Sequence, residues 1–286
     1  MSVRARGIAF TILTTLSVVG CGEPPEAPDT EPTIFLVDAA GETSRLLRIG
    51  PPAWAVVEVT TLPDGARGLA LDPDGERLIW ASRDGDVIQR GTRAGQSIET
   101  LPLAGHDSAY AVAIGAETGD LYWSDYGRDE ILRWDGVAES PMVLVTGLES
   151  PRAIAVDERS GWIYWVDRGA GRVGRAPLAG GAIENLVVEG LPAPYGLALD
   201  PIDGSLLVAD AELGSIFRWD PVTATLGSWL PDAGTHPSFV VFDEATEWVY
   251  WTDNRDNVLR RRSRNGGVVE VIAEGLAGPR GFVLVR

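Results

Sequence analysis

The chain has 286 residues, enough for two average domains or for one array of repeats. Acidic residues outnumber basic ones and give a net charge of −17, which argues against nucleic-acid binding because that requires basic patches. All 24 cationic residues are Arg, and without Lys neither a Schiff base nor a lysine general base is available.

The first 20 residues have the pattern of a secretory signal peptide. Arg4 and Arg6 precede an apolar run over residues 7–19, which is too short to span a bilayer as a helix. The following Val-Val-Gly-Cys resembles the lipobox of bacterial lipoproteins, in which the signal is cut before the cysteine and its thiol is acylated. An ordinary signal peptide with an incidental cysteine is the alternative. The sequence favours the lipoprotein, because Cys21 is the only cysteine and stands where the lipobox requires it.

A polar segment follows the cysteine. Residues 22–32 are rich in Pro and Glu and lack apolar periodicity, so we expect residues 21–32 to comprise a lipidated Cys21 and a disordered tether. Such a tether would reach roughly 30 Å when extended. Cleavage would remove two Arg and no acid, which changes the net charge from −17 to −19. The expected location is the bacterial cell envelope, periplasmic or surface-exposed, with the lipid anchor as the only membrane contact.

One short strand pattern recurs through residues 33–286. Its clearest copy is Val249–Asp253, a β-branched and aromatic run that ends in a turn-forming Asp. The copies end at intervals of 42 to 44 residues, a period typical of a propeller or a solenoid. The copies, called aromatic strands below, are Phe35–Asp38, Leu78–Ser82, Leu121–Asp125, Ile163–Asp167, Leu206–Asp210 and Val249–Asp253.

Three more strands are predicted around each aromatic strand. An inner strand that alternates small and large residues precedes it, and a third strand and a weaker outer strand follow it. The predicted inner strands are Ala66–Asp72, Ala109–Gly115, Pro151–Asp157, Pro194–Asp200, Pro237–Asp243 and Pro279–Val285. The predicted outer strands are Val56–Thr60, Ser97–Leu101, Met142–Thr146, Ile183–Val188, Leu226–Leu230 and Val268–Ala273.

The two ends of the array complement each other. The first unit lacks an inner strand, whereas Pro279–Val285 is an inner strand that follows the last complete unit. One C-terminal strand and three N-terminal strands would complete a ring and remove an exposed sheet edge. We therefore predict an all-β, six-bladed β-propeller over residues 33–286, with four antiparallel strands in each blade.

The aromatic strands resemble those of the YWTD (low-density-lipoprotein-receptor class B) six-bladed β-propeller. Val249–Asp253 matches that motif fully, and Leu121–Asp125 and Ile163–Asp167 each differ at one position. The period and the inner-strand pattern also fit NHL and gluconolactonase-like propellers. The YWTD resemblance implies that the aromatic residues pack between blades and that the closing Asp ties neighbouring blades by hydrogen bonds. By this resemblance the structural residues are Trp123, Trp165, Trp251, Asp125, Asp167 and Asp253, together with Asp38 and Asp210.

A ring of equivalent residues is the candidate binding site. One position near the start of each inner strand recurs around the axis and would lie at the mouth of the central channel. Arg offers bidentate donors to an anion, and Tyr offers an aromatic face to a sugar. Alternatively, these Arg pair with loop acids such as Asp64, Asp107 and Glu149 and only stiffen the loops. The candidate ligand-binding residues are Arg67, Tyr110, Arg152, Tyr195, His236, Ser238 and Arg280.

Catalytic and metal signals are weak. His106 and His236, the only two His, lie in loops before inner strands, and no Ser/His/Asp arrangement follows from the spacing. Loop carboxylates are scattered over different blades, so the sequence predicts no catalytic residue, metal site or cofactor. The run Arg260–Arg264 is either an anion patch or, as we favour, a strand of exposed Arg in an acidic protein.

These patterns favour a non-catalytic propeller that binds a protein or a small ligand through its channel mouth, and not nucleic acid. Two alternatives stay open: a lactonase- or lyase-like propeller enzyme that uses His106, His236 and channel carboxylates, and a structural envelope protein.

Overall fold

The computed structural model describes residues 31–40, 43–63, 65–103 and 107–286. The expected signal peptide, Cys21 and most of the expected tether lie outside the described residues. The end of that tether is in contact with the propeller, because the Glu31 carboxylate pairs with Arg261 at 2.5 Å and Pro32 is buried. Among the described residues, no helix is long and apolar enough to cross a membrane.

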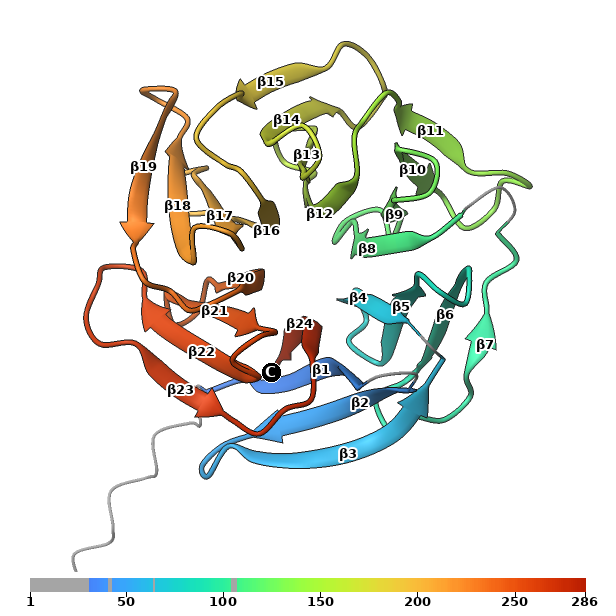
Figure 1. Ribbon diagram of the computed structural model, residues 1–286. Coiled ribbons are helices and arrows are strands. Elements are labelled where there is room, and N and C mark those ends of the chain that lie inside the picture. The colour runs from blue at the N-terminus through green and yellow to red at the C-terminus, as the bar shows by residue number, and fades with distance from the viewer. Residues whose placement is uncertain (1–30, 41–42, 64, 104–106) are drawn as a thin grey trace, which may run out of the picture. The chain divides into compact units, whose positions relative to one another are not determined.

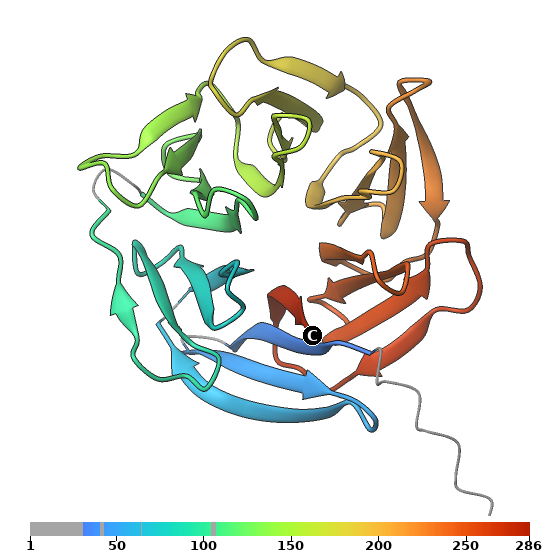
Figure 2. The same ribbon diagram turned by 180° about the vertical axis from the view of Figure 1, so that it is seen from behind.

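Six four-stranded antiparallel sheets form a ring, which is the predicted six-bladed propeller (Figures 1 and 2). In each blade the strands follow one another from the innermost to the outermost. Blade I is β24 (Pro279–Val285), β1 (Thr33–Ala40), β2 (Thr43–Gly50) and β3 (Ala55–Leu62); blade II is β4 (Ala66–Leu71), β5 (Arg77–Ser82), β6 (Val87–Thr92) and β7 (Glu99–Thr100); blade III is β8 (Ala109–Ile114), β9 (Leu121–Asp125), β10 (Glu130–Trp134) and β11 (Met142–Val145). Blade IV is β12 (Pro151–Asp157), β13 (Trp162–Asp167), β14 (Arg172–Pro177) and β15 (Glu184–Val187); blade V is β16 (Pro194–Leu199), β17 (Leu206–Asp210), β18 (Ser215–Asp220) and β19 (Thr225–Leu230); blade VI is β20 (Pro237–Asp243), β21 (Trp248–Asp253), β22 (Val258–Ser263) and β23 (Glu270–Ala273).

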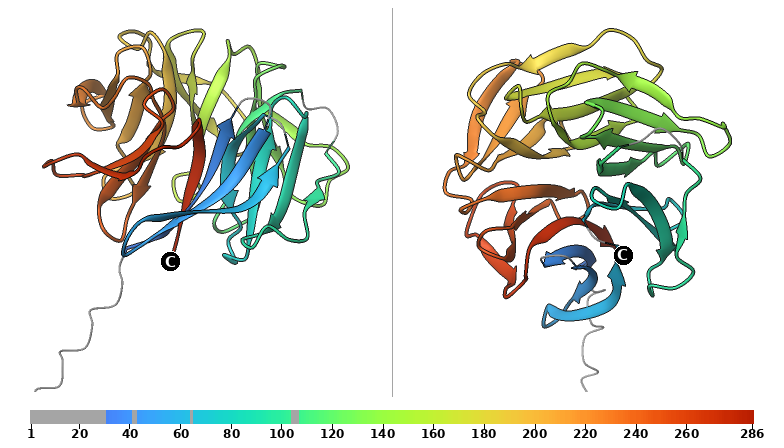
Figure 3. Two further views of the ribbon diagram at one scale, coloured as in Figure 1. Left: turned by 60° about the horizontal axis from the view of Figure 1, so that its bottom comes forward. Right: turned by 45° about the vertical axis from the view of Figure 1, so that its right-hand side comes forward.

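Blade I closes the ring as predicted, with one strand from the C-terminal end and three from the N-terminal end. β1 pairs with β24 on one side and with β2 on the other, and Thr33 lies opposite Val285. The inner strands line the axis, and the strands run between two faces of the ring (Figure 3). We call the face where inner strands begin and aromatic strands end the mouth face, and the opposite one the hairpin face. Thr33 and Val285 both lie at the hairpin face, since β1 begins there and β24 ends there.

The Tyr-Trp pair of the aromatic strand packs the two faces of a blade. Neighbouring strand residues point to opposite faces of a sheet. In β21, Tyr250 joins the core shared with blade I, and Trp251 joins the core shared with blade V. The same division holds in β9, where Tyr122 faces blade IV and Trp123 faces blade II. Each full motif therefore contributes one large side chain to each of two cores between blades.

The closing Asp of the aromatic strand binds the loop that arrives from the preceding blade. In five blades a buried Asp accepts a hydrogen bond from the N–H of that loop, as when Asp125 binds the Asp107 N–H at 2.7 Å. The other oxygen of Asp125 accepts from Gly127 and Arg128 in the following turn. The remaining loop bonds are Asp38 with Ala277 and Gly278, Asp167 with Glu149, Asp210 with Ala193, and Asp253 with His236.

Two details differ from the sequence predictions. The outer strand of blade II shortens to Glu99–Thr100, since Ser97 has a positive φ of 52° and Leu101 packs into the core between blades II and III. The basic run Arg260–Arg264 is mostly covered rather than exposed. Its Arg pair with acids of the same blade and of distant segments: Arg260 with Asp253 and Asp256, Arg261 with Glu31 and Glu270, and Arg264 with Asp200 and Asp203.

Candidate functional site

The ring residues lie in β-bulges at the mouth face. In every blade the pairing between the inner and the aromatic strand shifts register near the start of the inner strand. In blade III, Ala109 and Ala111 face Asp125 and Ser124, so Tyr110 is the extra residue. A bulge bends a strand and redirects its side chains, which places Tyr110 and its counterparts at the channel mouth.

The inner strands approach one another closely at this end. A Cβ added to Gly196 would lie 1.8 Å from the Ser238 carbonyl oxygen, and one added to Gly281 would lie 2.6 Å from that of Arg67. Only glycine allows this approach, so the ring residues of different blades converge on a narrow mouth.

Arg152 is at the centre of the site. Its Cζ lies 4.3 Å from the Tyr110 ring centroid, 4.5 Å from that of Tyr126 and 5.3 Å from that of Tyr195. The residue is only 5% exposed, and its Nε and Nη1 are buried without a hydrogen-bond partner in the described part of the chain. Cation–π contacts offset only part of the cost of burying a charge without a counter-ion. The guanidinium is therefore held among aromatic rings with unused donors.

A second group surrounds Tyr195. The Cζ of Arg168 and the imidazole of His236 each lie 5.3 Å from the Tyr195 ring centroid, and the Tyr110 ring lies 6.5 Å away. The Arg168 Nε is also buried without a partner among the residues that the structure describes. Arg168 and Tyr126 both come from turns after aromatic strands, so two layers of loops build the mouth.

Arg67 and Arg280 complete the basic side of the mouth. Burial and the like charge of Arg280 lower the pKa of Arg67 from its usual value. Arg67 lies 3.7 Å from Asp84, which also pairs with Arg83 at 2.7 Å. The Arg280 Nε is buried and lacks a partner among the described residues.

The two expected neutralising acids that the structure describes do not pair with the ring. Asp64 lies outside the described residues, and neither Asp107 nor Glu149 forms an ion pair with Arg67, Arg152 or Arg280 in the described structure. Within that same part of the chain, four mouth arginines form no ion pair with any acid: Arg152, Arg168, Arg255 and Arg280. The mouth thus contains arginine side chains that have no acid partner in the described structure.

The two remaining predicted residues of this site differ in accessibility. Ser238 is buried, and its hydroxyl donates to the His236 carbonyl at 3.1 Å, so it is engaged with its own loop. His236 is half-buried beside Tyr195, with its backbone N–H held by Asp253 at 2.9 Å. His106 lies outside the described residues.

His236 should make stability depend on mild acidification. Burial, followed by the positive charges of Arg255, Arg280 and Arg168, lowers the pKa of His236 below 6.5, against an opposing effect of Asp253. The unfolded chain then takes up a proton first as pH falls, so this contribution is complete above pH 6.5 and is lost below it. We expect urea unfolding to show a steeper loss of stability from about pH 7 to about pH 5.5 in the parent than in His236→Gln. If stability falls with pH equally in the parent and in His236→Gln, His236 is not the group that causes the loss.

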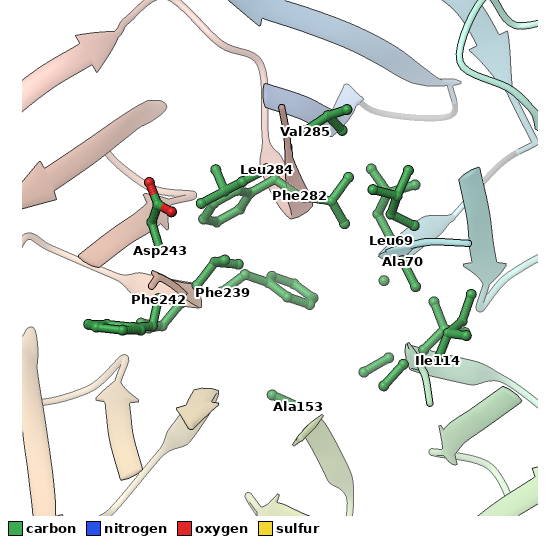
Figure 4. A pocket seen from close by; sticks show the side chains of 18 of the residues that line it. Leu69, Ala70, Ile114, Ala153, Phe239, Phe242, Asp243, Phe282, Leu284 and Val285 are labelled. Carbon is green, nitrogen blue, oxygen red and sulfur yellow. The ribbon is translucent and has the colours of Figure 1, made fainter. Parts of the chain in front are cut away.

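Two aromatic rings stack across the channel near the mouth. The Tyr110 and Phe239 rings come from the opposite blades III and VI and stack at 6.1 Å with an interplanar angle of 6°. Towards the hairpin face, the channel widens into a pocket of ≈ 730 Å³ into which Phe239 reaches (Figure 4). Its labelled apolar lining comprises Leu69, Ala70, Ile114, Ala153, Phe239, Phe242, Phe282, Leu284 and Val285. No group of three or more His, Cys, Asp or Glu among the described residues could hold a metal ion.

Sequence reasoning missed part of this site. Tyr126, Arg168 and Phe239 belong to it, and a usable signal existed for two of them. The residue directly after the end of the aromatic strand is Arg83 in blade II, Tyr126 in blade III and Arg168 in blade IV, so this position also repeats with the blade period.

Similar solved structures share the fold. One is a crystal structure of a nidogen/laminin complex, with a TM-score of 0.74 and 20% identity over 89% of this chain and 98% of that one. Another is catalytically inactive virginiamycin B lyase from Staphylococcus aureus with quinupristin, with a TM-score of 0.64 and 15% identity over 91% and 94% of the two chains. A selenomethionine-substituted virginiamycin B lyase from the same organism has a TM-score of 0.59 and 15% identity over 72% and 69%. At these identities the likeness shows the propeller fold alone. No family model matches the chain.

Proposed function

We propose that this protein is a non-catalytic binding propeller, held in the bacterial envelope by a lipid anchor at Cys21, whose ligand presents an anionic group to the mouth face. The ligand is a protein or a small molecule that carries a carboxylate, phosphate or sulfate. One observation carries the proposal: Arg152 is buried among three tyrosine rings, and two of its donors have no partner among the described residues.

The charge arrangement supports an anion specifically. A structural Arg normally has its donors satisfied, because an unsatisfied buried donor costs about 1–3 kcal/mol. The basic run Arg260–Arg264 shows that this chain can pair its cations, since its Arg260, Arg261 and Arg264 each bind two carboxylates. The mouth lacks such pairing around Arg152, and a ligand carboxylate would supply it with hydrogen bonds of about 1.5–3 kcal/mol each.

The aromatic rings define the rest of the ligand contact. Of the rings beside the guanidinium, Tyr126 is 38% exposed, whereas Tyr110 is buried. A group that enters the mouth therefore meets the Tyr126 ring before it reaches Arg152. Stacking on such a ring suits a sugar or the apolar stem of an acidic side chain.

Replacing Arg152 by Met should separate binding from folding. Met fills a similar apolar space without a charge, so we expect the free energy of unfolding to stay equal or to rise, whereas affinity for an anionic ligand should fall about 10- to 100-fold. The probes are citrate, inorganic phosphate and polygalacturonate, followed by calorimetric titration and thermal melting. Arg159→Met, an exposed Arg of blade IV at the hairpin face, is the matched control. A large loss of stability in Arg152→Met would make Arg152 structural, and unchanged affinity would place the binding surface elsewhere.

If Cys21 carries the lipid anchor, its substitution should move the protein from the membrane fraction to the soluble fraction. The Cys21→Ser variant cannot be acylated, so we expect it to move from the membrane pellet to the soluble fraction of fractionated cells. Immunoblotting of both fractions measures the distribution. A variant that sediments as the parent does would contradict the lipoprotein assignment.

A lyase-type reaction is the second candidate, favoured by one observation. His236 lies beside Tyr195 at the mouth, and its lowered pKa keeps the imidazole neutral and able to accept a proton at pH 7. If a substrate is turned over, His236→Ala should abolish turnover while leaving binding, and a variant that keeps full turnover would exclude this residue as the base.

A further inference from the structure

The hairpin face carries an apolar residue on the outer turn of every blade, half-buried in blade I and exposed in the other five. These turns connect the third strand to the outer strand, and because the strands alternate in direction all six lie at the hairpin face. We call their apolar residues the rim: Trp54, Ile98, Val137, Ile183, Val222 and Val268.

Three of the rim side chains are almost fully exposed to solvent. Val137, Val222 and Val268 are 87%, 89% and 81% exposed, more than any other large apolar residue among those described. Exposed apolar residues that are scattered singly need no explanation. The rim residues recur once per blade and all lie at the hairpin face. Together they form a ring of apolar side chains that faces one way.

Half-buried tryptophans beside arginines extend this surface. Arg261 lies over the rings of Trp54 and Trp248 at 5.1 and 4.3 Å, and Arg175 lies over Trp162 at 4.1 Å. Trp248 and Trp162 begin aromatic strands, so they lie at the hairpin face as well. Trp with a neighbouring cation is the composition that proteins place at the boundary between lipid headgroups and acyl chains.

The point at which the tether joins the propeller indicates that a bilayer is the surface next to the hairpin face. Glu31 is bound to Arg261 and Thr33 begins β1, so the N-terminal segment leaves the propeller at the hairpin face. Nine residues lie between Cys21 and Glu31, which gives a reach of roughly 30 Å. A lipid at Cys21 would keep the propeller within that distance of a bilayer, whichever way it turns.

We propose that the rim contacts the bilayer, so that the propeller stands on its hairpin face and presents the mouth away from the membrane. This inference rests on the lipid anchor of the proposed function. Acidic residues at the start of these turns, such as Asp135 and Asp220, accompany the rim, which favours zwitterionic over anionic lipid. The contact fixes an orientation that the tether alone leaves free.

The test uses the full-length acylated protein in phosphatidylcholine vesicles that contain brominated acyl chains. Bromine quenches Trp fluorescence only at short range, so the parent, whose Trp54, Trp162 and Trp248 lie at the hairpin face, should be quenched. A triple variant with Val137→Asp, Val222→Asp and Val268→Asp should lose this quenching while it still sediments with the vesicles. Val188→Asp with Leu213→Asp, which alters exposed apolar residues at the mouth face, should behave as the parent.

The outcomes separate the rim from the anchor. Equal quenching of the parent and the triple variant, with both sedimenting, would overturn the rim contact and leave the anchor intact. A parent that does not sediment with vesicles would overturn both. If the triple variant instead lowers the mass measured by light scattering in detergent, a second copy covers the rim and the bilayer contact is wrong.

Discussion

A chain that lacks residues 279–286 should not form a stable ring and should aggregate at temperatures at which the parent is folded. The deletion removes β24, the inner strand of blade I, and with it the whole ladder between Thr33–Asp38 and Pro279–Val285. Phe282 and Val285 are buried in the cores on either side of blade I, and burial of each contributes about 1.5–3 kcal/mol. With the strand hydrogen bonds, the loss approaches the total stability of a typical domain, about 5–15 kcal/mol.

The deletion also creates a site for aggregation. Without β24, one side of β1 becomes an unpaired edge that can pair with another chain. A synthetic peptide of residues 279–286 added in trans should occupy that edge. It should raise the melting temperature of the truncated chain and reduce its aggregation. Calorimetry and light scattering measure both effects. A truncated chain that melts at the temperature of the parent would mean that closure does not depend on β24. A truncated chain that the peptide leaves unchanged would mean that the freed edge of β1 is not the cause of its aggregation.

The Asp38→Ala substitution should destabilise the protein by about 2–6 kcal/mol, because it leaves two loop N–H groups without a partner at about 1–3 kcal/mol each. Asp38 is fully buried on β1, and it accepts hydrogen bonds from the Ala277 and Gly278 N–H groups at 2.9 and 2.8 Å. Those groups belong to the loop that carries the chain from blade VI into β24. Arg45 pairs with the same carboxylate at 2.5 Å, so the substitution also removes this ion pair and leaves the two N–H groups without a partner.

Glu58 provides a matched control, because it pairs with the same Arg45. That contact is 3.3 Å long and its carboxylate side chain is 49% exposed, so Glu58→Ala should cost less than about 1 kcal/mol. Urea denaturation of both variants gives the comparison. Similar losses in the two would show that the Asp38 bonds to the loop add nothing to ring closure.

The repeat pattern was sufficient to predict the fold. A closing residue at intervals of 42 to 44 residues indicated the number of blades, and the unpaired Pro279–Val285 indicated the way in which the ring closes. Both depend on backbone pairing, which follows sequence order closely in a propeller. The short β7 was less predictable, because its boundaries depend on how Leu101 and Leu103 fill the core beside it.

Side-chain partners between distant segments could not be predicted. Arg264 pairs with Asp200 of the neighbouring blade, and Arg261 pairs with Glu31, although neither acid is near in sequence. At the mouth, by contrast, the described acids Asp107 and Glu149 lie close in sequence to ring residues but form no ion pair with the ring arginines. Phe239 shows the same limit: its stacking on Tyr110 crosses the channel axis, and only the closed ring brings these two residues together.

The position of β1 in blade I has a mechanical consequence. The first strand of the propeller lies between β24 and β2, not at an edge of its sheet. A pull on the N-terminal segment along β1 would therefore load two hydrogen-bonded ladders in shear, so that many bonds share the force at once. An edge strand pulled outward would instead lose its bonds one after another, at a much lower force. A pull that enters the propeller through β1 is consequently borne by a strand with neighbours on both sides, and blade I as a whole carries the load.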